Sequence, residues 1–109
     1  MIEVNYSLRQ EKYSLISVKG HAGFGDPGKD LICSAVSSIF YGLMNALDEI
    51  EDGSEIYDNE EVIEIRILND DEIIQNYIHL VLIQLKTIEY SYGDYIKIRE
   101  RKWRNEIHS

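Results

Sequence analysis

Two long segments that repeat apolar residues at helical spacing constrain the fold of this chain most strongly. The first runs from Ile32 to Leu47 and the second from Ile74 to Ile88, with apolar residues three or four positions apart. Such spacing places the apolar side chains on one face of an amphipathic helix, and that face must pack against another layer. We therefore predict two helices that cover a common surface.

The remaining segments supply that surface, because several of them alternate apolar and polar residues as half-buried strands do. We expect Asn69 or Asp70 to cap the second helix and Gly93 to end it. The acidic segment 48–61 is predicted to be the frayed end of the first helix and a solvated connection. The predicted strands are residues 2–8, 13–18, 63–67 and 95–99.

This order of patterns predicts a single α+β domain over residues 1–109. Its two layers follow the order β-β-α-β-α-β, with a small mixed or antiparallel sheet and two helices packed on one face of it. A hairpin is expected to open the chain, because the polar turn 9–12 separates the first two strands.

Charge limits the partners of such a domain. The sequence has 11 Lys and Arg against 20 Asp and Glu, a net charge of −9. This charge repels phosphate backbones and anionic lipids, so neither direct nucleic-acid binding nor membrane binding is expected, whereas a basic protein would be attracted. An equally open alternative is that the charge serves only solubility. No apolar run is expected to cross a bilayer and no signal peptide follows Met1, which predicts a soluble cytoplasmic protein.

The segment 20–37 contains the residues most suited to chemistry. If Asp30 caps the first helix, Cys33 lies in the first helical turn, where unpaired N–H groups favour a thiolate and could bind an oxyanion. His21 follows the second strand, and a glycine-rich loop could fold back to place its imidazole beside the sulfur. Cys33 is expected beside the apolar stripe of the helix, whose core positions are taken by Ile32 and Val36.

Other interpretations of this segment remain open. A lone cysteine near a helix start is more often a packing residue than a nucleophile. The segment Gly23 to Gly28 also matches the dinucleotide-binding pattern G-x-G-x-x-G, but Pro27 interrupts it and the preceding strand belongs to a hairpin. One cysteine and three scattered histidines, His21, His79 and His108, give no pattern for a metal site. No cofactor or metal is therefore expected.

The run Gly20-His21-Ala22 together with Gly28-Lys29-Asp30-Leu31-Ile32-Cys33-Ser34-Ala35-Val36-Ser37 resembles the signature of the ribosomal-processing cysteine proteases, the Prp or YsxB-like family. The resemblance extends over the whole chain. It implies that Cys33 is the nucleophile and His21 its general base, with Asp30 and Ser37 as possible supporting residues. It also implies a flexible substrate loop, which contains Gly20, Gly23, Phe24, Gly25 and Gly28.

The resemblance further implies a substrate, the N-terminal extension of the twenty-seventh large-subunit ribosomal protein, and a homodimeric enzyme. The sequence itself neither shows nor excludes a dimer. Two alternatives of other classes remain: a non-catalytic ribosome-assembly factor that binds a basic ribosomal protein, and a redox-responsive protein in which Cys33 reacts without peptide cleavage.

Overall fold

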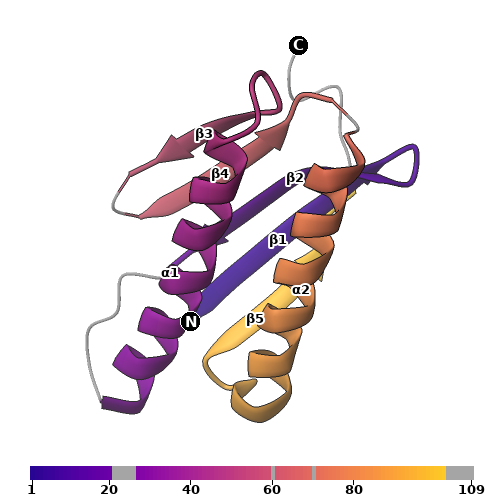
Figure 1. Cartoon of the computed structure of the whole chain (residues 1–109). Helices are drawn as coiled ribbons and strands as arrows, with labels where there is room; N and C mark the ends of the chain where they lie inside the picture. The colour runs from indigo at the N-terminus through magenta and orange to yellow at the C-terminus, as the bar shows by residue number, and fades with distance from the viewer. Residues whose placement is uncertain (21–26, 60, 70, 103–109) are drawn as a thin grey trace.

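A computed structural model describes residues 1–20, 27–59, 61–69 and 71–102, and for residues 27–30 it describes the backbone alone. A five-stranded sheet forms one layer and two helices form the other, both on the same face of the sheet (Figure 1). The elements in chain order are β1 (Ile2–Arg9), β2 (Lys12–Lys19), α1 (Pro27–Asp48), β3 (Ser54–Asp58), β4 (Val62–Ile67), α2 (Glu72–Tyr92) and β5 (Ile96–Glu100).

The sheet is mixed, with the strand order β3-β4-β2-β1-β5. Neighbouring strands are antiparallel except for β1 and β5, which are parallel and pair Ile2 with Ile96. The predicted α+β class, the two layers and the placement of both helices on one face are confirmed.

The strand β3 corrects the prediction that residues 48–61 contain only a helix end and a solvated connection. Ser54–Asp58 pairs antiparallel with β4, from Ser54 opposite Ile67 to Asp58 opposite Ile63. This edge strand is largely exposed, so its sequence carries only a weak alternation of apolar residues. Residues 54–58 form a strand because they pair with β4, and not because their own sequence has a strong strand pattern.

The hairpin of β1 and β2 forms as predicted. Its two turn residues, Gln10 and Glu11, both have positive φ angles, 52° and 66°. This is the backbone of a type I′ turn, whose twist matches that of the flanking strands. The hairpin therefore forms despite the absence of Asn or Gly at the turn.

Both helices begin at other residues than predicted. The N-cap of α2 is Asp71, whose carboxylate accepts a hydrogen bond of 2.7 Å from the Ile73 N–H. The helix α1 begins at Pro27 instead of after Asp30. Proline suits the first helical position because its φ is already helical and its missing N–H would have no partner there.

The core lies between the two layers. Ile2, Val4, Ile16, Val18, Ile63, Ile65 and Ile96 supply the sheet side of it, and Phe40, Leu47, Ile74, Ile78, Leu82 and Leu85 are among the residues that supply the helix side. The stretch Leu31–Asp48 of α1 is long and apolar enough to span a membrane, with a mean hydropathy of 1.4, contrary to the expectation from sequence. This is weak evidence for a membrane span, since a core helix passes the same test.

Candidate active site

Cys33 lies where the first helix approaches the end of the second strand. Its Sγ is 4.0 Å from the carbonyl oxygen of Gly20, the residue that follows β2. An S–H group at this distance is at most a weak donor. The thiol thus faces the point where the chain leaves the sheet for His21.

The backbone of Gly20 explains why the chain passes so close to the sulfur. Its φ is +80°, and a Cβ there would lie 2.7 Å from the carbonyl oxygen of Met1. Both conditions require glycine. The Gly20 N–H also donates to the Glu61 carbonyl, at 3.4 Å, which ties this turn to the chain just before β4.

The position of Cys33 corrects two predictions. Because α1 begins at Pro27, Cys33 is six residues further along, about 9 Å from the helix start at 1.5 Å per residue. The unpaired N–H groups belong to the first turn, so Cys33 does not lie among them. Cys33 also lies in the core, with 3% of its surface exposed, and not beside the apolar stripe.

The other predicted site residues are only partly placed. His21, Gly23, Phe24 and Gly25 lie outside the described residues, as does the side chain of Asp30. Gly28, which was expected in the loop, belongs to α1. Ser37 is half-buried and lies one helical turn after Cys33, on the same side of α1.

One more turn along this side of α1 lies Tyr41, which the sequence analysis did not single out. Its hydroxyl donates to Asp58 Oδ2 at 3.3 Å, at the end of β3. Partial desolvation and then the charge of Asp58 raise the pKa of this hydroxyl above its usual value. The four-residue spacing of Cys33, Ser37 and Tyr41 was the available sequence signal. Because β3 was not predicted, the contact of Tyr41 with Asp58 could not be predicted either.

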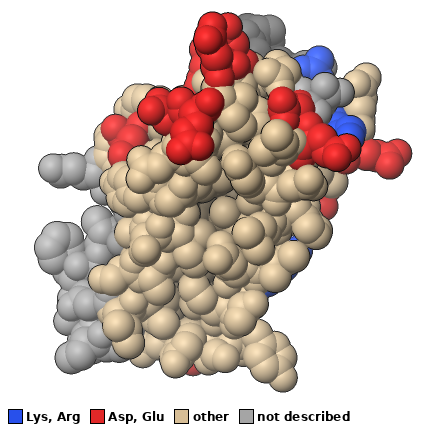
Figure 2. Space-filling view, in the orientation of Figure 1, with Lys and Arg blue, Asp and Glu red and all other residues tan. Residues whose placement is uncertain are grey.

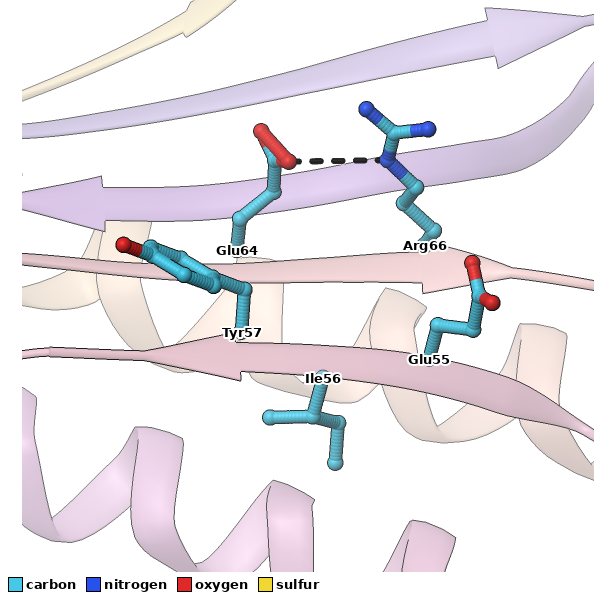
Figure 3. Close-up of a pocket in the computed structure, with 5 residues that line it drawn as sticks. All are labelled: Glu55, Ile56, Tyr57, Glu64 and Arg66. Atoms are coloured by element: carbon cyan, nitrogen blue, oxygen red, sulfur yellow. Dashed lines mark ion pairs between the residues drawn. The ribbon is translucent and has the colours of Figure 1, made fainter.

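A separate pocket of about 460 Å³ lies on the face of the sheet opposite the helices, between β3 and β4 (Figure 3). Glu55, Tyr57, Glu64 and Arg66 line it on the solvent side, while Ile56 points the other way, toward the helices. Arg66 Nε lies 3.5 Å from Glu64 Oε2. An exposed ion pair of this kind contributes little to stability.

Metal chemistry finds no support in the described part of the chain. Among these residues no group of three or more His, Cys, Asp or Glu side chains is placed to hold a metal ion. His79 is exposed on α2, and its Nδ1 is 3.0 Å from the Tyr13 hydroxyl. The thiol of Cys33, near the chain that leads to His21, is therefore the best candidate for a reactive group.

Comparisons with known proteins show the family of the chain. The sequence model of the family described as cysteine protease Prp matches residues 1–97. The ribosomal processing cysteine protease Prp of Mycoplasma genitalium is 30% identical over 105 residues, which cover 94% of this chain and 99% of that protein. The protein of the same description from Staphylococcus aureus is 31% identical over 104 residues, 90% of this chain and 97% of that protein.

Solved structures of the S. aureus protease have the same fold. One, in complex with a substrate peptide, superposes with a TM-score of 0.85 at 24% identity, covering 93% of this chain and all of the other. Another, with a covalently linked product peptide, superposes with a TM-score of 0.79 at 28% identity and the same coverage. On its sequence and its fold, this chain belongs to the cysteine protease Prp family.

Proposed function

We propose that this chain is an endopeptidase in which Cys33 attacks the scissile carbonyl and His21 is the general base. The observation that carries the proposal is the 4.0 Å approach of Cys33 Sγ to the carbonyl of Gly20. Gly20 immediately precedes His21 in the sequence, and this supports His21 as the base that we propose for Cys33.

The covalently linked product peptide in the S. aureus relative supports a nucleophilic mechanism. A thiol nucleophile would form a thioester with the acyl part of the substrate, and water would then release it. His21 would take the thiol proton during attack and give it to the leaving amine.

The burial of Cys33 adds a condition to this mechanism. A thiol with 3% of its surface exposed cannot contact a peptide carbonyl directly. Attack therefore requires a local change of structure near Gly20, which agrees with the proposed flexible substrate loop. Ser37, one turn along α1, would support the orientation of Cys33, and Asp30 that of the helix start.

The proposed substrate is the N-terminal extension of the twenty-seventh large-subunit ribosomal protein. The relatives are described as ribosomal processing proteases, and ribosomal proteins are basic as a class. A net charge of −9 would speed the encounter with such a partner. We propose that the enzyme acts in the cytoplasm, where ribosomes are assembled in bacteria, and that it acts there as a homodimer.

The decisive experiment is mass spectrometry of a peptide spanning the extension after incubation with the protein under reducing conditions. We expect cleavage at one bond and its loss, by at least about a thousandfold, in Cys33→Ala, Cys33→Ser and His21→Ala variants. Ser34→Ala is the matched control, because Ser34 is the exposed neighbour of Cys33 on α1 and should be dispensable.

Three outcomes would overturn the proposal. Cleavage retained in Cys33→Ala would exclude Cys33 as the nucleophile. Tight binding of the peptide without cleavage in any variant would indicate an assembly factor, whereas alkylation of Cys33 without binding or cleavage would indicate a redox-responsive thiol.

A further inference from the structure

The strand β3 lies at one edge of the sheet and has a neighbour, β4, on one side only (Figure 1). The Asn59 N–H donates to the Val62 carbonyl at 3.0 Å, which makes these two residues a hydrogen-bonded pair of the antiparallel ladder. Such pairs alternate with pairs that are not hydrogen-bonded. The N–H and carbonyl groups that point away from β4 are therefore those of Ser54, Ile56 and Asp58.

We call these outward groups, together with the side chains of the same three residues, the β3 edge. In the part of the chain that the structure describes, no hydrogen bond reaches its N–H or carbonyl groups. The edge is also open to solvent, since Ile56 at its centre is 41% exposed. A row of unpaired backbone groups on an exposed edge strand can accept another extended chain.

The charge of the β3 edge selects which chain it can accept. Residues 48–58 include six Asp or Glu and no Lys or Arg. Figure 2 shows acidic side chains gathered at this end of the helix layer. A second copy of the strand would bring acidic residues against acidic residues, which is one way in which proteins prevent pairing of their own edges. The same charges attract an extended segment that is rich in Lys and Arg.

A cavity of about 370 Å³ at the Ser54 end of the β3 edge fits such a segment. Its walls combine apolar and acidic side chains in one place. Lys and Arg side chains have an apolar stem and a charged tip, so they match both parts of the cavity. The apolar residues that line it are Leu47, Ile50 and Ile56, and the acidic ones are Asp48, Glu51 and Asp52.

The other end of the β3 edge leads toward the candidate active site. Asp58 accepts a hydrogen bond from the Tyr41 hydroxyl at 3.3 Å. Tyr41 lies eight residues after Cys33 on α1, which is about 12 Å along the helix. An extended peptide covers that distance in about four residues. A substrate bound at Cys33 can therefore reach Asp58 and continue along the edge.

We infer that the β3 edge binds a basic, extended segment of the substrate that follows the scissile bond. The inference rests on the proposed function and deepens it by placing the part of the ribosomal protein that remains after cleavage. The segment runs from Asp58 toward Ser54, antiparallel to β3, and adds a strand to the sheet. A Lys or Arg about eight positions beyond the scissile bond then enters the acidic cavity.

This binding lies far from the reacting carbonyl, so it affects substrate and transition state alike. Interactions of that kind lower KM and leave kcat nearly the same. Because the attraction is between exposed charges, it weakens as salt is added. A substrate that includes the basic segment should therefore have a KM at least about tenfold lower than one that lacks it, and the advantage should shrink at high salt.

Amide hydrogen exchange measured by NMR tests the pairing directly. The ligand is a synthetic peptide of about twelve residues that follow the scissile bond, long enough to span the edge. We expect exchange at Ser54, Ile56 and Asp58 to slow at least about tenfold when the peptide is saturating. Glu55 and Tyr57 are the internal control, because their N–H groups already face β4 and should be protected in both states.

Two results of this experiment would overturn the inference. The first is unchanged exchange at the three outward residues when the peptide is bound. The second is exchange that slows with protein concentration in the absence of peptide, because a second copy would then occupy the edge.

A proline at the centre of the edge tests the same pairing through kinetics. Ile56→Pro removes an outward N–H, and proline is tolerated in an edge strand where the N–H faces solvent. Ile56→Ala is the matched control, because it removes the same side chain and keeps the N–H. For the long substrate we expect KM to rise at least about tenfold in Ile56→Pro and less than about threefold in Ile56→Ala. Equal effects of the two variants would overturn the inference.

A charge variant keeps the test valid if the proline variant folds poorly. Glu51→Gln with Asp52→Asn removes two negative charges from the cavity, and Asn tolerates the positive φ of 57° at position 52. Glu11→Gln with Glu100→Gln is the control, because it removes two negative charges from exposed residues outside the β3 edge. We expect peptide binding at least about fivefold weaker for the first pair and less than about twofold weaker for the second. Equal weakening would show that only net charge matters and would overturn the inference.

A short substrate that ends just after the scissile bond separates this inference from the proposed function. If the short and long substrates are cleaved with the same KM, the proposed function stands and the β3 edge is refuted. If neither is cleaved, the proposed function is refuted, and the exchange experiment still decides whether the edge binds the basic segment.

Discussion

The two ends of β2 are attached to the helix layer in different ways. At the start of the strand, the side-chain amide of Gln75 in α2 bonds both backbone groups of Tyr13, accepting from its N–H at 2.7 Å and donating to its carbonyl at 2.9 Å. At the other end, Cys33 of α1 meets the Gly20 carbonyl at 4.0 Å. The first attachment is strong and specific, and the second is long and weak.

The difference suggests separate roles for the two ends of β2: one end contributes to stability, and the other allows movement beside the thiol. A side chain that satisfies two partly buried backbone groups is hard to displace, because both groups would lose their partners. A thiol near a carbonyl at 4.0 Å loses little when the chain moves. The hydrogen bonds at Tyr13 therefore fix the hairpin to α2. The weak contact at Gly20 lets the chain beside Cys33 Sγ move at little cost in free energy.

Among the variants that test this contrast, Gly20→Ala should have the largest effect on stability. The methyl group would meet the Met1 carbonyl at 2.7 Å and the backbone would be strained at a φ of +80°. We expect a loss of about 3 kcal/mol in the free energy of unfolding, from strain and overpacking together. Urea denaturation measures this loss, and a loss below about 0.5 kcal/mol would show that this end adapts freely.

The activity of the Gly20→Ala variant tests whether the position of the Gly20 carbonyl matters to the thiol. Because the displaced Gly20 carbonyl adjoins Cys33 Sγ, kcat/KM for the ribosomal-protein peptide should fall by more than the fraction of unfolded protein explains. A fall that merely follows the unfolded fraction would mean that the position of Gly20 does not matter to the thiol.

Gln75→Ala tests the strong end. Tyr13 would keep an unpaired N–H and carbonyl, at a cost of about 2 kcal/mol in the free energy of unfolding. Gln75 and Cys33 contact opposite ends of β2. At a temperature where the Gln75→Ala protein stays folded, kcat/KM should therefore not change. Asn76→Ala, at the exposed next position of α2, is the control and should cost less than about 0.5 kcal/mol. A loss of activity without a loss of stability would contradict the division of roles.

The smallest expected effect is that of Tyr13→Phe. Burial raises the pKa of the Tyr13 hydroxyl above its ordinary 10.0, with smaller contributions from Tyr6 and Glu100. The folded protein then holds this proton more tightly than the unfolded chain, so stability falls as the pH rises above 10.0. Tyr13→Phe should cost about 1 kcal/mol at neutral pH, through the lost His79 contact, and should lessen the alkaline fall. An unchanged alkaline profile would refute the assignment to Tyr13.

Much of the fold could be predicted from sequence because its signals are local. The alternation in residues 2–8 and 62–67 and the apolar stripe from Ile74 to Leu85 reflect burial on one face, which side-chain period alone indicates. The strand β3 could not be predicted in this way. It is an edge strand whose pairing with β4 depends on contacts that its own sequence does not encode.

His21 and Cys33 were proposed as the site from their residue types and positions and from the resemblance to a family, and both stay predictions. The geometry around Cys33 was not predicted, because the start of α1 depended on choosing between Asp30 and an earlier residue. Pro27 was the available signal, because proline favours the first turn of a helix. The core position of Cys33 follows from the helical face that it shares with Val36 and Phe40, three and seven residues further on, which are both fully buried.

The parallel pairing of β1 with β5 determines when this protein can assemble. The first strand of the chain lies inside the sheet, and one of its two neighbours is the last strand, through contacts such as the Ile2 N–H to the Tyr95 carbonyl at 2.8 Å. Contacts so distant in sequence give a high contact order and slow folding. During synthesis β1 therefore lacks one of its two neighbours until residues 96–100 have left the ribosome, and the sheet stays incomplete until then.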